Sequence, residues 1–165
     1  MAANHQSYLD PPVLGFSLKR PSYYIAKYEL FSHRLMGWLL ANLHAIPIKR
    51  SAADLQAYKK AINLLLSGEC LVLFPEGTRS RGDQFLEPKL GVGLLALAAK
   101  VPIVPVYLKN TRGFWKTFFK KSISVRFGKP IEPDWLKRIP ADRSGYQKVA
   151  QEIMRRIEAL KSRLV

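Results

Sequence analysis

A short apolar run at residues 70–73, CLVL, lies between Gly68 and Pro75 and constrains the fold of this chain more than any other stretch. Such a run, with β-branched content and with glycine and proline at its ends, is typical of a strand buried in a parallel sheet. In open α/β sheets, ligands bind beyond the carboxyl ends of such strands. The following loop, FPEGTRS at residues 74–80, is therefore where we expect a site. An ordinary surface turn is the alternative, since turns also contain proline, glycine and charged residues.

A second landmark stands near the start of the chain, where His5 precedes Asp10 by five positions. If a helix begins near Ser7, an aspartate one turn into it can reach back and hold one imidazole nitrogen. The other nitrogen can then accept a proton, as a general base must. A lone pair of this kind is more often a capping or packing contact. Together with the loop at residues 74–80, however, the pair is a much more specific signal for a catalytic site.

The apolar pattern of the rest of the chain alternates between helical and extended periods. It predicts helices at residues 9–18, 31–44, 89–99 and 145–164, and one more that starts at Ser51 or Asp54 and ends at Gly68. It predicts strands at residues 22–26, 45–48, 70–73, 101–108 and 122–127, the last at an edge of the sheet. Gly91 and Gly93 would let their helix approach the sheet closely. This order predicts an α/β fold, an αβα sandwich whose mixed, mainly parallel central sheet is flanked by helices.

Lysine and arginine outnumber the acidic residues of this 165-residue chain by 27 to 12, which gives a formal net charge of +15. Such a charge predicts an anionic partner, and nucleic acid and an anionic membrane surface are the two obvious candidates. A nucleic-acid binder should show an exposed aromatic sheet motif or a basic recognition helix, and neither is clear here. We therefore expect no nucleic-acid partner. A basic module that binds nucleic acid or an anionic surface is the alternative function.

The cysteine and the histidines of the sequence do not indicate a metal site. Cys70 is the only cysteine, and together with the three histidines it shows no metal-ligand spacing, so we expect no metal site. His33 and His44 also lack a carboxylate at a useful distance along the chain, although a base needs an orienting partner. We interpret both histidines as structural.

Two stretches of the chain together resemble a known family. NHQSYLD at residues 4–10 and FPEGTRS at residues 74–80 are similar to the first and third motifs of the glycerolipid acyltransferases, whose best-known members are the lysophosphatidate acyltransferases. Two weaker motifs, IPIKR at residues 46–50 and VPIVPV at residues 101–106, fall in the right order. The resemblance runs from Asn4 to about Pro133 and implies the same αβα fold.

The resemblance also implies an activity. The chain would be an O-acyltransferase that moves a fatty acyl group from acyl-CoA or acyl-carrier protein to the free hydroxyl of a lysophospholipid. The acceptor implied first is lysophosphatidate, which becomes phosphatidate in phospholipid biosynthesis. The acyl donor is a co-substrate, so no cofactor is expected. The alternative is a truncated relative that keeps the fold without the activity.

An acyl transfer from a thioester to an alcohol needs a base for the alcohol and a grip on the acceptor. His5 would be the base, and Asp10 would hold its tautomer and stabilise the imidazolium, as in a serine-hydrolase dyad but without a protein nucleophile. The planar fork of Arg79 suits a phosphate group. Arg50 could supply a second grip, although a solvated charge explains Arg50 equally well.

The resemblance assigns acceptor binding to the third motif as a whole. Gly77 and Thr78 would complete its turn beside Arg79. Glu76 would orient the loop or the acceptor rather than act as a second base.

Residues 1–165 are expected to form one acyltransferase domain. Members of the family usually have a hydrophobic or amphipathic segment and a strand before the first motif. Residues 1–3 are too few to form that strand, so we expect this chain to lack the membrane-associating segment. The expected location is the cytoplasmic face of a membrane, where the protein is peripheral or anchored by a segment absent from this chain.

The stretch at residues 112–121 mixes cationic and aromatic side chains: Arg112, Lys116, Lys120 and Lys121 with Phe114, Trp115, Phe118 and Phe119. This pairing suits lipid headgroups and the acyl boundary together, so the stretch is predicted to dock on an anionic membrane. In the competing interpretation, the aromatic residues belong to the core and the charges are merely solvated.

Overall fold

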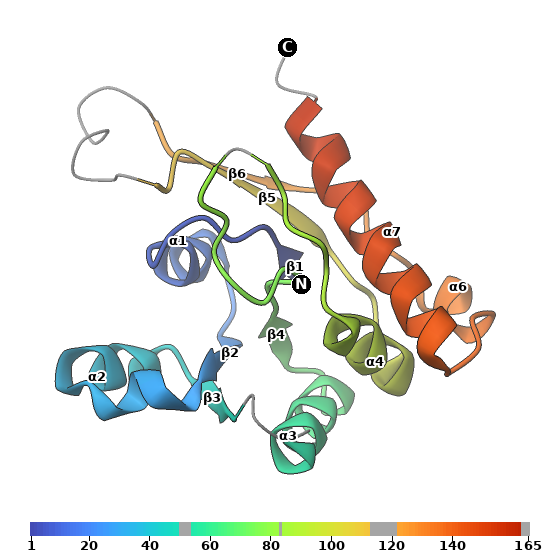
Figure 1. Ribbon diagram of the computed structural model, residues 1–165, viewed down its shortest axis with the longest axis horizontal. Helices are drawn as coiled ribbons and strands as arrows, with labels where there is room; N and C mark the ends of the chain where they lie inside the picture. Colours follow the sequence, from blue (N-terminus) through green and yellow to red (C-terminus); the bar gives the residue numbers. More distant parts are fainter. Residues whose placement is uncertain (50–53, 83, 113–121, 163–165) are drawn as a thin grey trace.

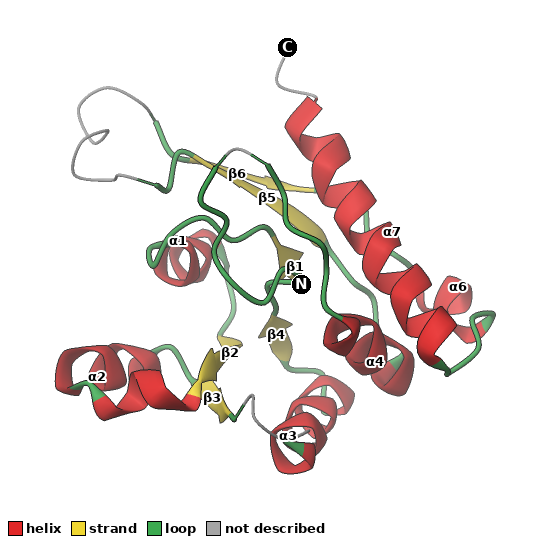
Figure 2. Cartoon of the chain, in the orientation of Figure 1, coloured by secondary structure: helices red, strands yellow, loops and turns green. Residues whose placement is uncertain are grey.

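Helices cover both faces of a layer of strands in the computed structural model (Figures 1 and 2), which describes residues 1–49, 54–82, 84–112 and 122–162. The strands in these ranges are β1 (Ala2–Ala3), β2 (Ser22–Lys27), β3 (Ala45–Ile48), β4 (Cys70–Val72), β5 (Pro105–Lys109) and β6 (Ser124–Phe127). The helices are α1 (Asp10–Ser17), the 3-10 helix η1 (Tyr28–Ser32), α2 (Arg34–Asn42), α3 (Leu55–Leu66), α4 (Leu90–Ala99), α6 (Pro133–Lys137) and α7 (Arg143–Ser162).

The strands form two hydrogen-bonded groups, in the orders β3-β2-β4 and β1-β5-β6. Backbone bonds join the groups, because Ala3 N–H donates to the Leu73 carbonyl and Leu73 N–H donates to the Met1 carbonyl, both at 2.9 Å. The strand pairs are parallel except for the antiparallel pair of β5 and β6, and β6 lies at the edge. The predicted mixed, mainly parallel sheet is confirmed.

The first residues of the chain correct one expectation. Ala2 and Ala3 pair in parallel with Pro105 and Val106, so residues 1–3 do form the strand that carries the first motif. Both alanine side chains are buried. Two paired residues suffice here because β1 lies between Leu73 and β5, and finds backbone partners on both sides.

Successive strand residues pack on opposite faces of the sheet, as the pleat requires. Val72 and Val106 pack with Leu14 of α1, whereas Leu71 packs with α3 and α4, and Tyr107 packs with α4 and α7. Helices α3, α4 and α7 therefore cover one face, and α1 covers the other. The predicted αβα sandwich is confirmed.

The two glycines of α4 make their close contacts with helices and not with the sheet. A Cβ atom at Gly93 would lie 2.0 Å from the carbonyl oxygen of Tyr146 in α7, and one at Gly91 would lie 2.3 Å from the hydroxyl of Tyr58 in α3. The expected close approach to the sheet is therefore wrong. Glycine allows α4 to sit this near to α7 because it has no Cβ.

Candidate active site

The first motif leaves β1 through Asn4, whose side chain is buried. Its Nδ2 donates to the Leu108 carbonyl at 3.1 Å, and its Oδ1 accepts the Leu108 N–H at 2.7 Å. The amide thus satisfies both backbone groups of a β5 residue, and the chain can turn away from the sheet at His5. The sequence pattern predicts no role for Asn4 alone, although its place directly before the histidine is a signal for one.

The side chains of His5 and Asp10 meet at the start of α1. Nδ1 of His5 lies 2.8 Å from Oδ2 of Asp10, and the same oxygen accepts the backbone N–H groups of Gln6 at 2.6 Å and Ser7 at 2.8 Å. A carboxylate only accepts, so Nδ1 carries the hydrogen of this contact and Nε2 is the acceptor of the neutral ring. No described residue bonds Nε2. The structure therefore brings the expected pair together, and its catalytic role stays a prediction.

Burial and local sequence hold this pair in place. Asp10 is fully buried, and the His5 side chain is 17% exposed. Pro11 and Pro12 lie in the first turn of α1, where their missing N–H groups and fixed φ suit the start of a helix. The helix begins at Asp10, three residues later than the start we considered, and the aspartate reaches the histidine from its first turn.

Phe74 packs against the imidazole from the third motif. The two ring centroids lie 4.1 Å apart, and the ring planes differ by 19°. The stacked phenyl ring limits rotation of the His5 side chain on one side, while Asp10 holds one ring nitrogen. The strand that ends in the third motif therefore contributes directly to the orientation of the His5 ring.

Glu76 ties the two motifs together. It is 1% exposed, and its Oε1 accepts the His5 N–H at 2.8 Å while its Oε2 accepts the Leu86 N–H at 2.9 Å. Burial raises the pKa of Glu76, although the two N–H donors act in the opposite direction. The contacts give Glu76 a positioning role within the protein. Direct contact between Glu76 and an acceptor stays a prediction.

The turn after Glu76 requires glycine. Gly77 has a φ of +66°, in the left-handed region, and its N–H donates to the Phe74 carbonyl at 2.9 Å. A side chain at this position would be strained. The turn delivers Thr78 and Arg79 to the surface beside the first motif.

An open hollow of about 460 Å³ lies where the two motifs meet, and it is lined by Gln6, Ser7, Tyr8, Thr78, Arg79, Ser80, Arg81 and Arg112. The guanidinium carbon of Arg79 lies 3.5 Å from the centroid of the Tyr8 ring, a cation–π contact. Three arginines in the lining suit an anionic ligand.

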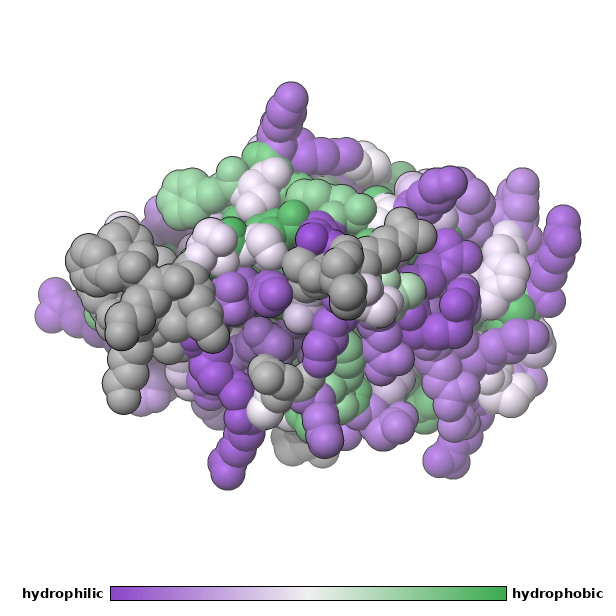
Figure 3. All heavy atoms as spheres, turned by 90° about the horizontal axis from the view of Figure 1, so that it is seen from above, coloured by the Kyte–Doolittle hydropathy of each residue, from purple (hydrophilic) through white to green (hydrophobic). Residues whose placement is uncertain are grey.

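Seen from above the view of Figure 1, hydrophilic side chains cover most of the visible face, and an apolar area lies along one margin (Figure 3).

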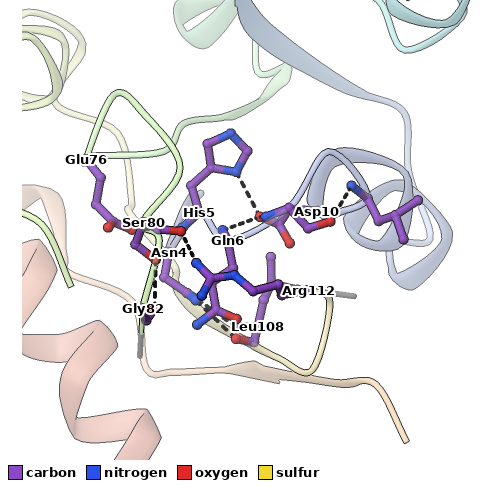
Figure 4. A network of polar contacts seen from close by, with 11 residues as sticks. Asn4, His5, Gln6, Asp10, Glu76, Ser80, Gly82, Leu108 and Arg112 are labelled. Carbon is purple, nitrogen blue, oxygen red and sulfur yellow. Dashed lines mark hydrogen bonds and ion pairs between the residues drawn. The ribbon is translucent and has the colours of Figure 1, made fainter. Parts of the chain in front are cut away.

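Arg112 belongs to the same network (Figure 4). Its guanidinium donates to the carbonyl oxygens of Ser80 and Arg81, and the Ser80 N–H donates to the His5 carbonyl at 2.8 Å. The sequence pattern places Arg112 in the predicted membrane-docking stretch and does not predict this contact. The available signal was its place just after a strand that neighbours the first motif.

A family model described as Acyltransferase matches residues 1–109, which is most of the chain and includes both motifs. The chain belongs to this acyltransferase family. The resemblance found in the two motifs is thereby confirmed.

Named relatives and one solved structure are similar to this acyltransferase. It is 31% identical over 162 residues to the 1-acyl-sn-glycerol-3-phosphate acyltransferase of Streptococcus pneumoniae, with 97% of this chain and 59% of that protein covered. It is 28% identical over 165 residues to the Bacillus subtilis protein of the same name, with 99% and 81% covered. The crystal structure of the 1-acyl-sn-glycerophosphate (LPA) acyltransferase PlsC from Thermotoga maritima superposes with a TM-score of 0.69 at 26% identity, over 99% of this chain and 66% of that one. The chain thus spans about three fifths of the S. pneumoniae relative and about two thirds of the T. maritima protein.

Some expectations for this acyltransferase concern residues outside the described ranges. These are Arg50, the expected second grip on phosphate, and residues 113–121 of the expected membrane-docking stretch. Within the described ranges, no group of three or more His, Cys, Asp and Glu side chains could hold a metal ion. The helices in those ranges include none that is both long and apolar enough to cross a membrane.

Proposed function

We propose that this acyltransferase moves a fatty acyl group from acyl-CoA or acyl-carrier protein to the free hydroxyl of lysophosphatidate, and so forms phosphatidate for phospholipid biosynthesis. One observation carries the proposal: Nδ1 of His5 lies 2.8 Å from Oδ2 of Asp10, beside a hollow that Arg79 lines. The proposed base, His5, then lies near the proposed anion-binding residue, Arg79, as an acceptor with both a hydroxyl and a phosphate group requires. The name shared by the S. pneumoniae and B. subtilis relatives supports this choice of acceptor.

The proposed reaction uses His5 twice. Its Nε2 accepts the proton of the acceptor hydroxyl while the hydroxyl oxygen bonds to the thioester carbonyl carbon. The tetrahedral oxyanion then collapses, the carbon–sulfur bond breaks, and the proton on Nε2 passes to the departing thiolate. The products are the new ester and a free thiol. Asp10 accepts a hydrogen bond from Nδ1 and stabilises the imidazolium between the two steps.

The proposed grip on the acceptor centres on Arg79. Its planar fork can donate to two phosphate oxygens at once. The stack on Tyr8 limits rotation of the guanidinium plane. Gly77 and Thr78 present the arginine from the turn, and Arg50 is the proposed second grip.

The proposed place of the reaction is the cytoplasmic face of an anionic membrane. The acceptor is amphipathic, and the net charge of +15 favours an anionic surface. Residues 113–121 are the proposed contact, because they combine cationic and aromatic side chains. We leave Arg112 out of this contact since its guanidinium bonds the loop of the third motif.

An acyl-transfer assay tests the proposal. The protein is mixed with anionic vesicles that carry one lysophospholipid from a head-group panel, and with labelled acyl-CoA or labelled acyl-carrier protein. We expect labelled phosphatidate from lysophosphatidate, no product with His5→Ala, and normal product with His33→Ala, an exposed histidine outside the site. Transfer only to a neutral lysophospholipid would overturn the proposal that lysophosphatidate is the acceptor. Transfer to none of the panel from either donor would overturn the activity and favour an inactive relative.

A further inference from the structure

Arg112 reaches the third motif from the end of β5. The strand pairs with β1, which leads into His5, so its end lies at the same edge of the sheet as the first motif. Asn110 then has a φ of +62° and turns the chain, and the fully buried Thr111 anchors it directly before Arg112. The backbone that carries the arginine is therefore held next to the site.

The guanidinium of Arg112 bonds two consecutive carbonyl groups. Nη1 donates to the Arg81 oxygen, and Nη2 donates to the Ser80 oxygen. Ser80 is also held from its other side, because its N–H donates to the His5 carbonyl at 2.8 Å. One peptide segment is thus fixed between the end of β5 and the loop of the base (Figure 4).

Among the residues that the structure describes, few other contacts restrain this part of the loop. Arg81 and Gly82 are exposed, and the Ser80 hydroxyl donates to the Gly82 carbonyl at a long 3.3 Å. A guanidinium carries its N–H donors in a rigid plane, so donors on two nitrogens restrain two carbonyl groups together. A lysine ammonium has no such fork. The contact is therefore specific to arginine.

We propose that Arg112 is a positioning residue for the acceptor: it holds Ser80 and Arg81 so that Arg79 lines the hollow beside His5. This inference rests on the proposed function of the same site. Arg112 lines the hollow too, so the competing role is direct contact with the anionic head group. A residue that acts through Arg79 loses its effect when Arg79 is removed, whereas an independent contact adds to the effect of Arg79.

A double-mutant cycle separates the two roles. Arg112→Met should raise the KM for lysophosphatidate about tenfold, since hydrogen bonds to a charged group are lost, and should leave kcat and the KM for acyl-CoA within about threefold. Arg112→Lys should restore only part of the loss. In an Arg79→Ala background, adding Arg112→Met should change the acceptor KM less than about twofold. If the two effects multiply instead, Arg112 contacts the acceptor directly and the positioning role is overturned.

Hydrogen–deuterium exchange gives a second readout that needs no activity. The Ser80 amide should exchange about tenfold faster in Arg112→Met than in the wild type, and faster by a smaller factor in Arg112→Lys, because the segment opens more often, while α4 and α7 keep their wild-type rates. Arg143→Met, at an exposed arginine outside the hollow, should leave the Ser80 rate unchanged. If Arg112→Met raises exchange throughout the protein, the Ser80 exchange rate of Arg112→Lys tests the inference in its place. Unchanged Ser80 exchange overturns the inference, and a wild-type protein without transfer activity overturns only the proposed function.

Discussion

The backbone N–H of His5 donates to Oε1 of Glu76 at 2.8 Å, which joins two motifs that lie 71 residues apart in the chain. The second oxygen of the same carboxylate accepts the Leu86 N–H at the far end of the loop. One buried carboxylate therefore sets the position of His5 relative to the loop that carries Arg79.

His5→Ala should lower the rate of acyl transfer by about 100- to 10,000-fold while the protein stays folded, because proton transfer by a positioned group contributes that much. Asp10→Asn should cost nearly as much, since the bond at 2.8 Å to Nδ1 then loses its charge. Steady-state rates and circular dichroism check both variants against His33→Ala. A rate for His5→Ala within about threefold of wild type would remove this residue from the mechanism.

Arg79→Ala should raise the KM for lysophosphatidate far more than the KM for the acyl donor, because the bidentate grip on phosphate is lost. Arg79→Lys should recover only part of the lost affinity for lysophosphatidate, since an ammonium cannot donate as a planar fork. Kinetics with each substrate varied in turn measure the two constants. Equal changes in both constants would point to a general defect of the loop.

Glu76→Gln should change how stability depends on pH. With its pKa raised in the folded state, Glu76 binds more protons in the folded than in the unfolded protein as pH rises from 4.5 toward the folded pKa. The free energy of unfolding of the wild type should therefore fall relative to that of the glutamine variant across this window, by at most about 1.4 kcal/mol per pH unit for one proton. Urea denaturation of both proteins between pH 4.5 and pH 7.5 measures the difference, with pH 4.5 being the ordinary pKa of the carboxyl. If the free energy of unfolding of the wild type instead rises relative to that of the glutamine variant as pH increases, the raised pKa is contradicted.

Gly93→Ala should destabilise the protein by about 1–3 kcal/mol, since overpacking at a tight contact costs that much. The new Cβ would lie 2.0 Å from the Tyr146 carbonyl, and α7 would have to move because the obstacle is backbone. Gly82→Ala is the matched control, since its Cβ would meet nothing closer than 3.9 Å. Equal midpoints of urea denaturation for the two variants would refute the proposed tight packing.

Replacement of Lys116, Lys120 and Lys121 by serine should weaken binding to anionic vesicles by about 3 kcal/mol at low salt, since each basic residue near such a surface contributes about 1 kcal/mol. The salt dependence of binding should fall as well. Vesicle co-sedimentation measures both. A variant with Lys59, Lys60 and Lys148 replaced by serine removes the same charge from exposed positions on α3 and α7. Equal losses in the two variants would show that total charge, and not this stretch, drives binding.

Local patterns predicted most of the elements because caps, turns and periodicity depend on residues within a few positions of one another. β3 has the expected bounds, Ala45–Ile48. Asp54 caps α3 by accepting the Ala57 N–H at 3.0 Å, and Gly68 follows that helix with a φ of +83°. The short helix α6 was not predicted, since five residues are too few to show a period.

The positions of the site residues were also open to prediction. Ligands bind beyond the carboxyl ends of parallel strands, so the pattern alone placed the loop after residues 70–73 at the site. His5 was linked to that loop only by the family resemblance, because residues 1–3 were not expected to form a strand. The structure indeed places His5 and Asp10 beside the loop that starts at Phe74.

What the sequence determined by itself was most of the elements, the two motifs and the edge of the sheet where the third motif lies. Only the tertiary structure decided that two residues suffice for β1, that Gly93 touches Tyr146, and that Arg112 bonds the Ser80 carbonyl. Each of these contacts joins residues that lie far apart in the chain. Such contacts depend on how complete elements pack against one another. A pattern of neighbouring residues therefore does not predict them.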